Sequence, residues 1–228
     1  APADTARLVD GRVVVEPLGA SVAVPPYWLG GPAPPYFPRE MCPGVDRGTV
    51  ADRVVTGPAR LAALRDVLGD LSRRGRAVEW SREFSAAADS ALPFTALVAQ
   101  FGGVPWGAPC GAPHVRVYVG DYTPAALDST AARGAAAAAR FFAPVRREAA
   151  DSGGWHVARV SWEAWYHDYG GTARLEFWAR PAGGRTLVLV FMLGYWFPEA
   201  ERGDRAAILA SVRMAPPGAA RAAAPGGV

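Results

Sequence analysis

Two glutamates in the C-terminal third of the chain have the type and spacing of a catalytic carboxylate pair. Glu163 and Glu176 fall on one face of two neighbouring predicted strands, two positions out of register if Gly170-Gly171 forms the turn between them. That spacing could bring the two carboxyl groups to the separation that glycoside hydrolases use. Trp165 and Trp178 share this face and could act as stacking platforms for a sugar. A hydrolase is therefore one interpretation of this face.

An exposed sheet surface explains the same residues without any reaction. Arg159 and Arg174 alternate with the glutamates, as is typical of antiparallel strands on which opposite charges pair across the sheet. An exposed pair of this kind contributes only about 0.2–1 kcal/mol, so we expect little loss of stability when Glu163 or Glu176 is replaced by Gln. We favour this interpretation, with Arg174, Trp165 and Trp178 as candidate ligand-binding residues.

The histidines supply acid–base groups without a recognisable catalytic motif. His156, His167 and Asp168 are the candidates, and His167 would join the two glutamates in a hydrolase; the simpler interpretation of His167-Asp168 is the polar end of a strand entering a turn. The motifs Gly-x-Ser-x-Gly, His-Glu-x-x-His and Gly-x-Gly-x-x-Gly do not occur, and all 24 basic residues are Arg. Without lysine, Schiff-base chemistry and a P-loop are excluded. We predict no cofactor.

The two cysteines allow either a metal half-site or a disulfide. Cys110 and His114, with Cys42, have a tolerable spacing for zinc, but a second ligand pair of the usual kind is lacking. Both cysteines lie in Pro/Gly-rich segments, which suits a disulfide in an oxidising compartment. We predict the Cys42–Cys110 disulfide and no metal.

A proline-rich segment with four aromatic residues is the main candidate for a recognition loop. Residues 25–43 contain seven prolines, which exclude a helix or a central strand. Such a stiff backbone lowers the entropy that is lost on binding. The alternative is a structural flap that packs its aromatic side chains on the core. The candidate binding residues here are Tyr27, Trp28, Tyr36 and Phe37.

The elements that must position these residues are strands at both ends of a domain and helices between them. Strands are predicted over 12–16, 21–24 and 115–119, and helices over 58–75, 80–88, 94–101 and from Pro124 to Phe142, with another helical piece ending at Gly153-Gly154. Three strands between Trp155 and Phe197, with turns at Gly170-Gly171 and Gly183-Gly184, form an antiparallel meander. A final helix opens at Pro198.

The predicted register of the meander defines an apolar core face. Ala164 lies opposite Phe177, Tyr166 opposite Leu175 and Phe177 opposite Val190. The other residues on this face are Ala158, Val160, Trp162, Ala179, Val188 and Met192.

Charge and hydropathy limit the partners that the chain could have. The net charge is +3, but the arginines are scattered among acids, so we predict no nucleic-acid binding. The longest apolar run, residues 187–197, is too short to cross a bilayer, which needs about 20 residues. The first residues, Ala-Pro-Ala-Asp-Thr-Ala, look like what remains after removal of a signal peptide. We therefore expect an exported protein, periplasmic or extracellular, from a GC-rich genome.

Both ends of the domain resemble small exported proteins of the PsbP/Mog1-like type. The residues concerned are Val22-Ala23-Val24-Pro25-Pro26-Tyr27-Trp28 and Ala207-Ile208-Leu209-Ala210-Ser211-Val212-Arg213. In that family an extended strand ends in a Pro-x-Trp-like turn, and the last helix ends in a similar Leu-x-Ser-hydrophobic-Arg run. The resemblance implies an α/β/α sandwich around an antiparallel sheet, a role in binding or assembly, and no catalytic motif.

Together these observations predict an α+β fold in which helices pack on an antiparallel sheet that ends in a three-stranded meander. We expect a flexible N-terminus over 1–11, one domain over 12–214 with a helical insert at about 47–103, and a disordered tail over 215–228. The predicted function is non-catalytic binding of a protein or small ligand, with a role in envelope assembly or maintenance. The alternative is the hydrolase that uses Glu163 and Glu176.

Overall fold

The computed structural model describes residues 6–23, 25, 97–102, 114–140, 142–166, 169–193 and 198–214. Several predictions fall outside these residues. They concern the recognition loop with Tyr27, Trp28, Tyr36 and Phe37, the Cys42–Cys110 disulfide, His167 and Asp168, the tail, and the helical insert apart from residues 97–102.

A small antiparallel sheet brings the two ends of the described chain together. It contains β1 (Ala6–Val9), β2 (Arg12–Val15), β3 (Ala20–Ala23) and β10 (Arg213–Met214), in that order, with the short 3-10 helix η1 (Glu16–Leu18) between β2 and β3. The strands predicted over 12–16 and 21–24 are confirmed to within a residue. Residues 6–9, which we expected within a flexible N-terminus, form β1 instead because their backbone pairs with β2.

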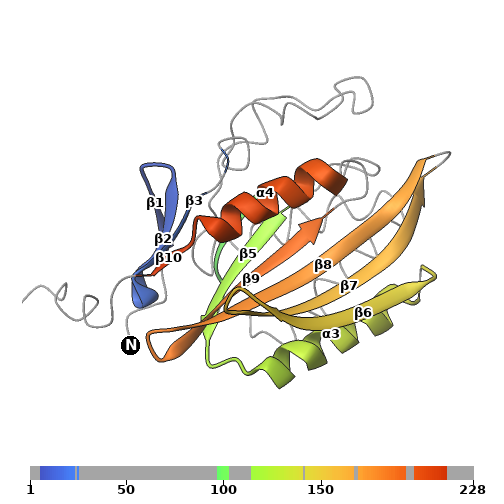
Figure 1. The fold of residues 1–228 in the computed structure, drawn as a ribbon, viewed down its shortest axis with the longest axis horizontal. Coiled ribbons are helices and arrows are strands. Elements are labelled where there is room, and N and C mark those ends of the chain that lie inside the picture. Colours follow the sequence, from blue (N-terminus) through green and yellow to red (C-terminus); the bar gives the residue numbers. More distant parts are fainter. Residues whose placement is uncertain are drawn as a thin grey trace, which may run out of the picture.

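A large antiparallel sheet carries the rest of the fold (Figure 1). Its order is β4-β5-β9-β8-β7-β6, and its strands are β4 (Leu97–Gly102), β5 (His114–Gly120), β6 (Val145–Ser152), β7 (Trp155–Tyr166), β8 (Tyr169–Ala182) and β9 (Arg185–Leu193). Residues 97–101 and 145–152, predicted as helical, are strands. For β6 the reason is tertiary: Gly153-Gly154, at positive φ, turns the chain into a hairpin with β7, and this pairing overrides helix propensity.

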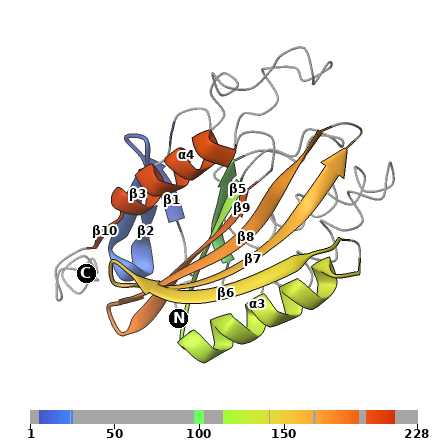
Figure 2. The same cartoon turned by 45° about the vertical axis from the view of Figure 1, so that its right-hand side comes forward.

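Two helices cover opposite faces of the large sheet and make an α/β/α sandwich (Figures 1 and 2). Helix α3 (Pro124–Ala138) begins as predicted, because Thr123 accepts a hydrogen bond from the Ala126 amide at 3.2 Å. It packs on β6, β7 and β8, and α4 (Pro198–Ala210) packs on β9 and β3. The α+β fold class is confirmed. Among the helices of the described residues, none combines the length and apolar character needed to cross a membrane.

The meander has the predicted faces, but its first turn lies elsewhere. Gly183-Gly184 forms the second turn as predicted, and Phe177 pairs with Val190. In the first hairpin, however, Tyr166 pairs with Tyr169, and Gly170-Gly171 lie inside β8. Phe177 therefore lies opposite Ala158 and not Ala164, and Leu175 lies opposite Val160 and not Tyr166.

The register error leaves the faces unchanged because it is an even number of residues and side chains alternate along a strand. The core against α3 accordingly contains every residue of the predicted apolar face whose side chain is described. These are Ala158, Val160, Trp162, Leu175, Phe177, Ala179, Val188, Val190 and the partly buried Met192. The opposite face of the sheet packs against α4 and the small sheet.

Candidate ligand-binding site

Glu176 is the centre of a charged cluster on the α4 side of the sheet. The side chain is 0% exposed, and both of its oxygens accept hydrogen bonds from Nη1 of Arg205 in α4, at 2.6 and 2.8 Å. Trp178 donates its indole N–H to the same carboxylate at 2.8 Å, and Nε of Arg159 lies 3.6 Å from it. Glu176 is thus a buried, fully engaged anion and not the exposed strand residue that we expected.

Trp178 belongs to this cluster and is not available as a binding platform. Its side chain is only 7% exposed. The guanidinium carbons of Arg159 and Arg205 lie 5.3 and 5.6 Å from its ring centroid, close enough for cation–π attraction. The prediction that Trp178 contacts a ligand is therefore wrong: its ring is covered by the two arginines that neutralise Glu176.

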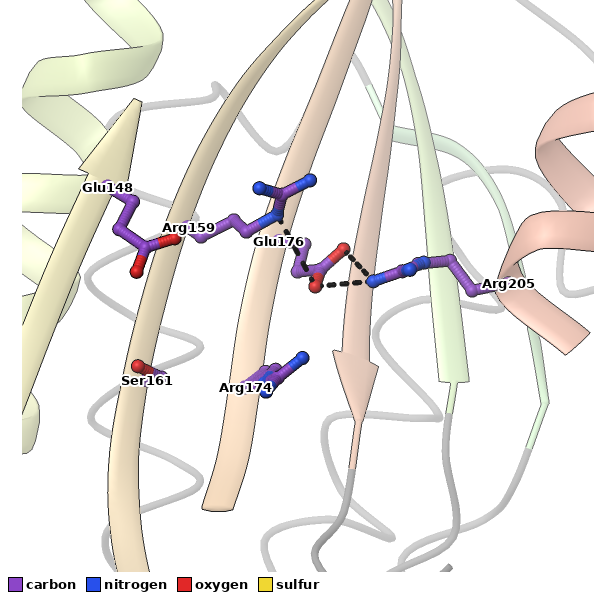
Figure 3. A pocket seen from close by; sticks show the side chains of 6 residues that line it. All are labelled: Glu148, Arg159, Ser161, Arg174, Glu176 and Arg205. Atoms are coloured by element: carbon purple, nitrogen blue, oxygen red, sulfur yellow. Dashed lines mark hydrogen bonds and ion pairs between the residues drawn. The ribbon is translucent and has the colours of Figure 1, made fainter. Parts of the chain in front are cut away.

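A cavity of about 170 Å³ adjoins the cluster. Its lining comes from β6, β7, β8 and α4, and consists of Glu148, Arg159, Ser161, Arg174, Glu176 and Arg205 (Figure 3). The strand register explains the grouping, because Glu148, Arg159 and Glu176 lie opposite one another in one row, and Ser161 and Arg174 in the next row of the same face. Long side chains of one face in adjacent rows lie within reach of one another.

The cavity has an excess of positive charge. Three guanidinium groups face two carboxylates, and the Glu176 carboxylate is already engaged by Arg205 and Arg159. Arg174 is half-buried, and within the described part of the chain its guanidinium group forms no ion pair. Of the candidate binding residues in the large sheet whose side chains are described, Arg174 alone lines the cavity.

The observed register of β7 and β8 places Glu163 and Glu176 far apart. Glu163 lies opposite Thr172 and accepts a hydrogen bond from its hydroxyl at 2.9 Å. Glu176 is four residues further along β8, which is about 13 Å of strand. The predicted offset was two residues. Paired catalytic carboxyls lie about 5–9.5 Å apart, so these two glutamates do not form such a pair.

His156 lies on the other side of the sheet, between α3 and the β6–β7 hairpin. Its Nε2 lies 3.0 Å from Asp128, and its Nδ1 lies 3.0 Å from Asp151. Burial lowers the pKa of His156, but hydrogen bonds to Asp128 and Asp151, and their charges, outweigh this effect and raise the pKa above its ordinary value. Because a carboxylate occupies each ring nitrogen, the histidine links two elements and has no nitrogen left for a substrate.

Four cavity residues, Glu148, Arg159, Ser161 and Arg205, were not among the predicted site residues. Arg159 was interpreted only as a cross-strand partner of the glutamates. Glu148 lies in a segment predicted as helical, and Ser161 carries no distinctive signal. The sequence does carry a signal for Arg205, because Ile208, Leu209 and Val212 follow it at the i+3, i+4 and i+7 positions of one helix face. Of the remaining predicted residues, Trp165 and His114 lie in β7 and β5, but their side chains are outside the described set.

Comparisons with known proteins add little to this geometry. No family model and no curated protein matches the chain, so the resemblance to PsbP/Mog1-like proteins stays a prediction. Among solved structures, the chain is similar to LpqN, a protein involved in cell envelope biogenesis of Mycobacterium tuberculosis. The identity is 15%, the TM-score is 0.33, and the match covers 52% of this chain and 72% of that chain. A likeness of this extent carries no conclusion about function.

Proposed function

We propose that this protein is an exported, non-catalytic domain that binds a small ligand, and that it holds an anionic group of the ligand in the cavity beside Glu176. The observation that carries the proposal is the half-buried residue Arg174, which lines a cavity together with two further arginines. A guanidinium group presents a planar fork of donors that suits carboxylate and phosphate oxygens.

The surrounding contacts explain why an anion would be attracted rather than merely tolerated. Arg205 and Arg159 hold the only fully buried carboxylate of the cavity, so Glu176 does not compete for Arg174. Ser161, opposite Arg174 in β7, adds a hydroxyl that can donate to an oxyanion. Desolvation in a partly enclosed cavity strengthens such charge-assisted hydrogen bonds.

The volume of the cavity limits what it can hold. About 170 Å³ is below the roughly 300–1,000 Å³ of pockets that enclose drug-sized ligands. The bound group is therefore small, either a complete metabolite or the charged end of a larger molecule. The Pro/aromatic segment with Trp28 remains the predicted site for a larger portion or for a protein partner, and a role in envelope assembly or maintenance remains part of the proposal.

The hydrolase alternative has less support. It required two carboxylates at catalytic separation and accessible tryptophans. Glu163 and Glu176 lie too far apart, Glu176 is engaged by two arginines, and Trp178 is buried beneath those same side chains.

Titration calorimetry with phosphate and with acetate tests the proposal. The wild type should bind at least one of these anions, and Arg174→Gln should weaken binding by about tenfold or more, since charge-assisted hydrogen bonds contribute roughly 1.5–3 kcal/mol. Arg133→Gln is the matched control, because Arg133 is exposed on α3, on the opposite face of the sheet. Equal binding by Arg174→Gln and the wild type, or no binding of either anion, would refute the proposal.

A further inference from the structure

Glu148 is the one carboxylate of the cavity that the buried cluster leaves unused. It lies in β6 directly opposite Arg159, where an exposed sheet would normally form a cross-strand ion pair. Arg159 turns away instead, and its Nε approaches Glu176 at 3.6 Å (Figure 3). Its guanidinium group lies over the Trp178 ring. In the described part of the chain, Glu148 has no ion-pair partner.

The cavity therefore has two ends of opposite charge. Arg174 and Ser161 lie on β8 and β7, and the Glu148 side chain points into the cavity from the edge strand β6 (Figure 3). Glu148 and Arg174 are two strands apart, about 10 Å across the sheet. Because both side chains are long and line the same cavity, the gap between their charged groups suits a ligand only a few bonds in length.

We infer that the ligand is a small zwitterion, with an oxyanion held by Arg174 and Ser161 and an ammonium group held by Glu148. This inference rests on the proposed anion site and deepens it. A simple anion would place its charge near an uncompensated carboxylate at the rim, whereas an ammonium group a few bonds away converts that repulsion into an ion pair. The oxyanion is a carboxylate, as in an amino acid, or a phosphate, as in an aminoalkyl phosphate headgroup.

Matched pairs of ligands isolate the contribution of the ammonium group. β-Alanine is compared with propionate, and phosphoethanolamine with ethyl phosphate, by calorimetry at pH 7.5 and constant ionic strength. In the wild type we expect the zwitterion of one pair to bind at least fivefold more tightly than its anion. The pair that shows this preference identifies the oxyanion as carboxylate or phosphate.

The variant Glu148→Gln assigns the preference to Glu148. The exposed position of Glu148 on the edge strand means that this variant should fold. It should bind the anions at least as well as the wild type but lose the preference for the zwitterions. Glu199→Gln is the control, because Glu199 is 91% exposed on α4, does not line the cavity, and its loss changes the net charge equally.

The outcomes separate this inference from the proposed function. Equal binding of zwitterion and anion by the wild type, or a preference that survives in Glu148→Gln, would overturn the zwitterion and leave the anion site intact. If neither anions nor zwitterions bind, both proposals fail. A preference that disappears equally in Glu199→Gln would reflect net charge alone and would also overturn the inference.

Discussion

One nitrogen of Arg205 in helix α4 donates to both carboxylate oxygens of Glu176 in strand β8, at 2.6 and 2.8 Å, across 29 positions of sequence. This contact joins the closing helix to the middle of the large sheet. Since Glu176 is completely buried, the contact also explains how a charge is accommodated there: the carboxylate is held by Arg205, Arg159 and the Trp178 indole.

Replacing Glu176 should therefore destabilise the fold strongly. Glu176→Gln leaves the Arg205 guanidinium, whose side chain is 16% exposed, without its counter-ion. Breaking one partner of a buried ion pair costs about 3–5 kcal/mol, and we expect a loss of about 3 kcal/mol in the free energy of unfolding, measured by urea titration. Glu163→Gln removes a charge but keeps an oxygen that can accept the partly exposed hydrogen bond from Thr172, so it should lose about 1 kcal/mol or less. Similar losses in both variants would contradict the role of Glu176.

The stability that His156 contributes by linking α3 to the β6–β7 hairpin should depend on pH. The folded-state pKa of His156 is raised, so its stabilising effect is fully present below the ordinary pKa of histidine and is lost as the pH rises through the folded-state value. The free energy of unfolding of the wild type should be higher than that of His156→Gln, and this difference should be larger at pH 5.5 than at pH 8.5. The difference should be about 0.2–1 kcal/mol, because Asp128 and Asp151 are partly solvated, at 44% and 87% exposed.

An NMR titration checks this prediction directly, since the chain has only three histidines. The His156 resonance should titrate at a higher pH than in the urea-unfolded chain, and Asp128→Asn should reduce that difference. A stability difference between the wild type and His156→Gln that grows with pH would have the wrong sign for this mechanism.

The two diglycine sequences of the meander should respond differently to alanine. Gly184 has φ of +82° in the turn between β8 and β9, and a Cβ there would meet no atom, so the cost of Gly184→Ala comes from the backbone alone, about 1 kcal/mol. Gly171 lies within β8 opposite Ala164, where alanine is compatible with an extended backbone. Urea unfolding of Gly171→Ala should show unchanged or slightly higher stability. The opposite ranking would favour a turn at Gly170-Gly171.

The predicted Cys42–Cys110 disulfide is open to a direct measurement. Mass spectrometry of protein purified without reductant, after alkylation and proteolysis, should find the two cysteine peptides linked. The loop that the bond would close is long, and its closure contributes about 4 kcal/mol in the chain-entropy model. Alkylation of both thiols without prior reduction would reject the disulfide and weaken the expectation of an oxidising compartment.

Local sequence patterns were sufficient to predict the elements whose start or turn is set by residues within the element itself. Thr123 and Pro124 mark the start of α3, Pro198 opens α4, and Gly183-Gly184 forms a turn because glycine readily adopts positive φ. Alternation of apolar residues likewise placed Ala158, Val160 and Trp162 on one buried face, because the period of two holds whatever the register.

Only the tertiary structure decided what those elements pair with. In the first hairpin Tyr166 pairs with Tyr169 and the two glycines lie inside β8, and this register moves Glu163 away from Glu176. Residues 145–152 have a helix-compatible composition but become the edge strand that brings Glu148 to the cavity. Burial of Glu176 depends on Arg205, which arrives from a helix remote in sequence. Strand register and helix docking are set by free energies summed over many residues, so spacing within one segment determines the faces but not the partners.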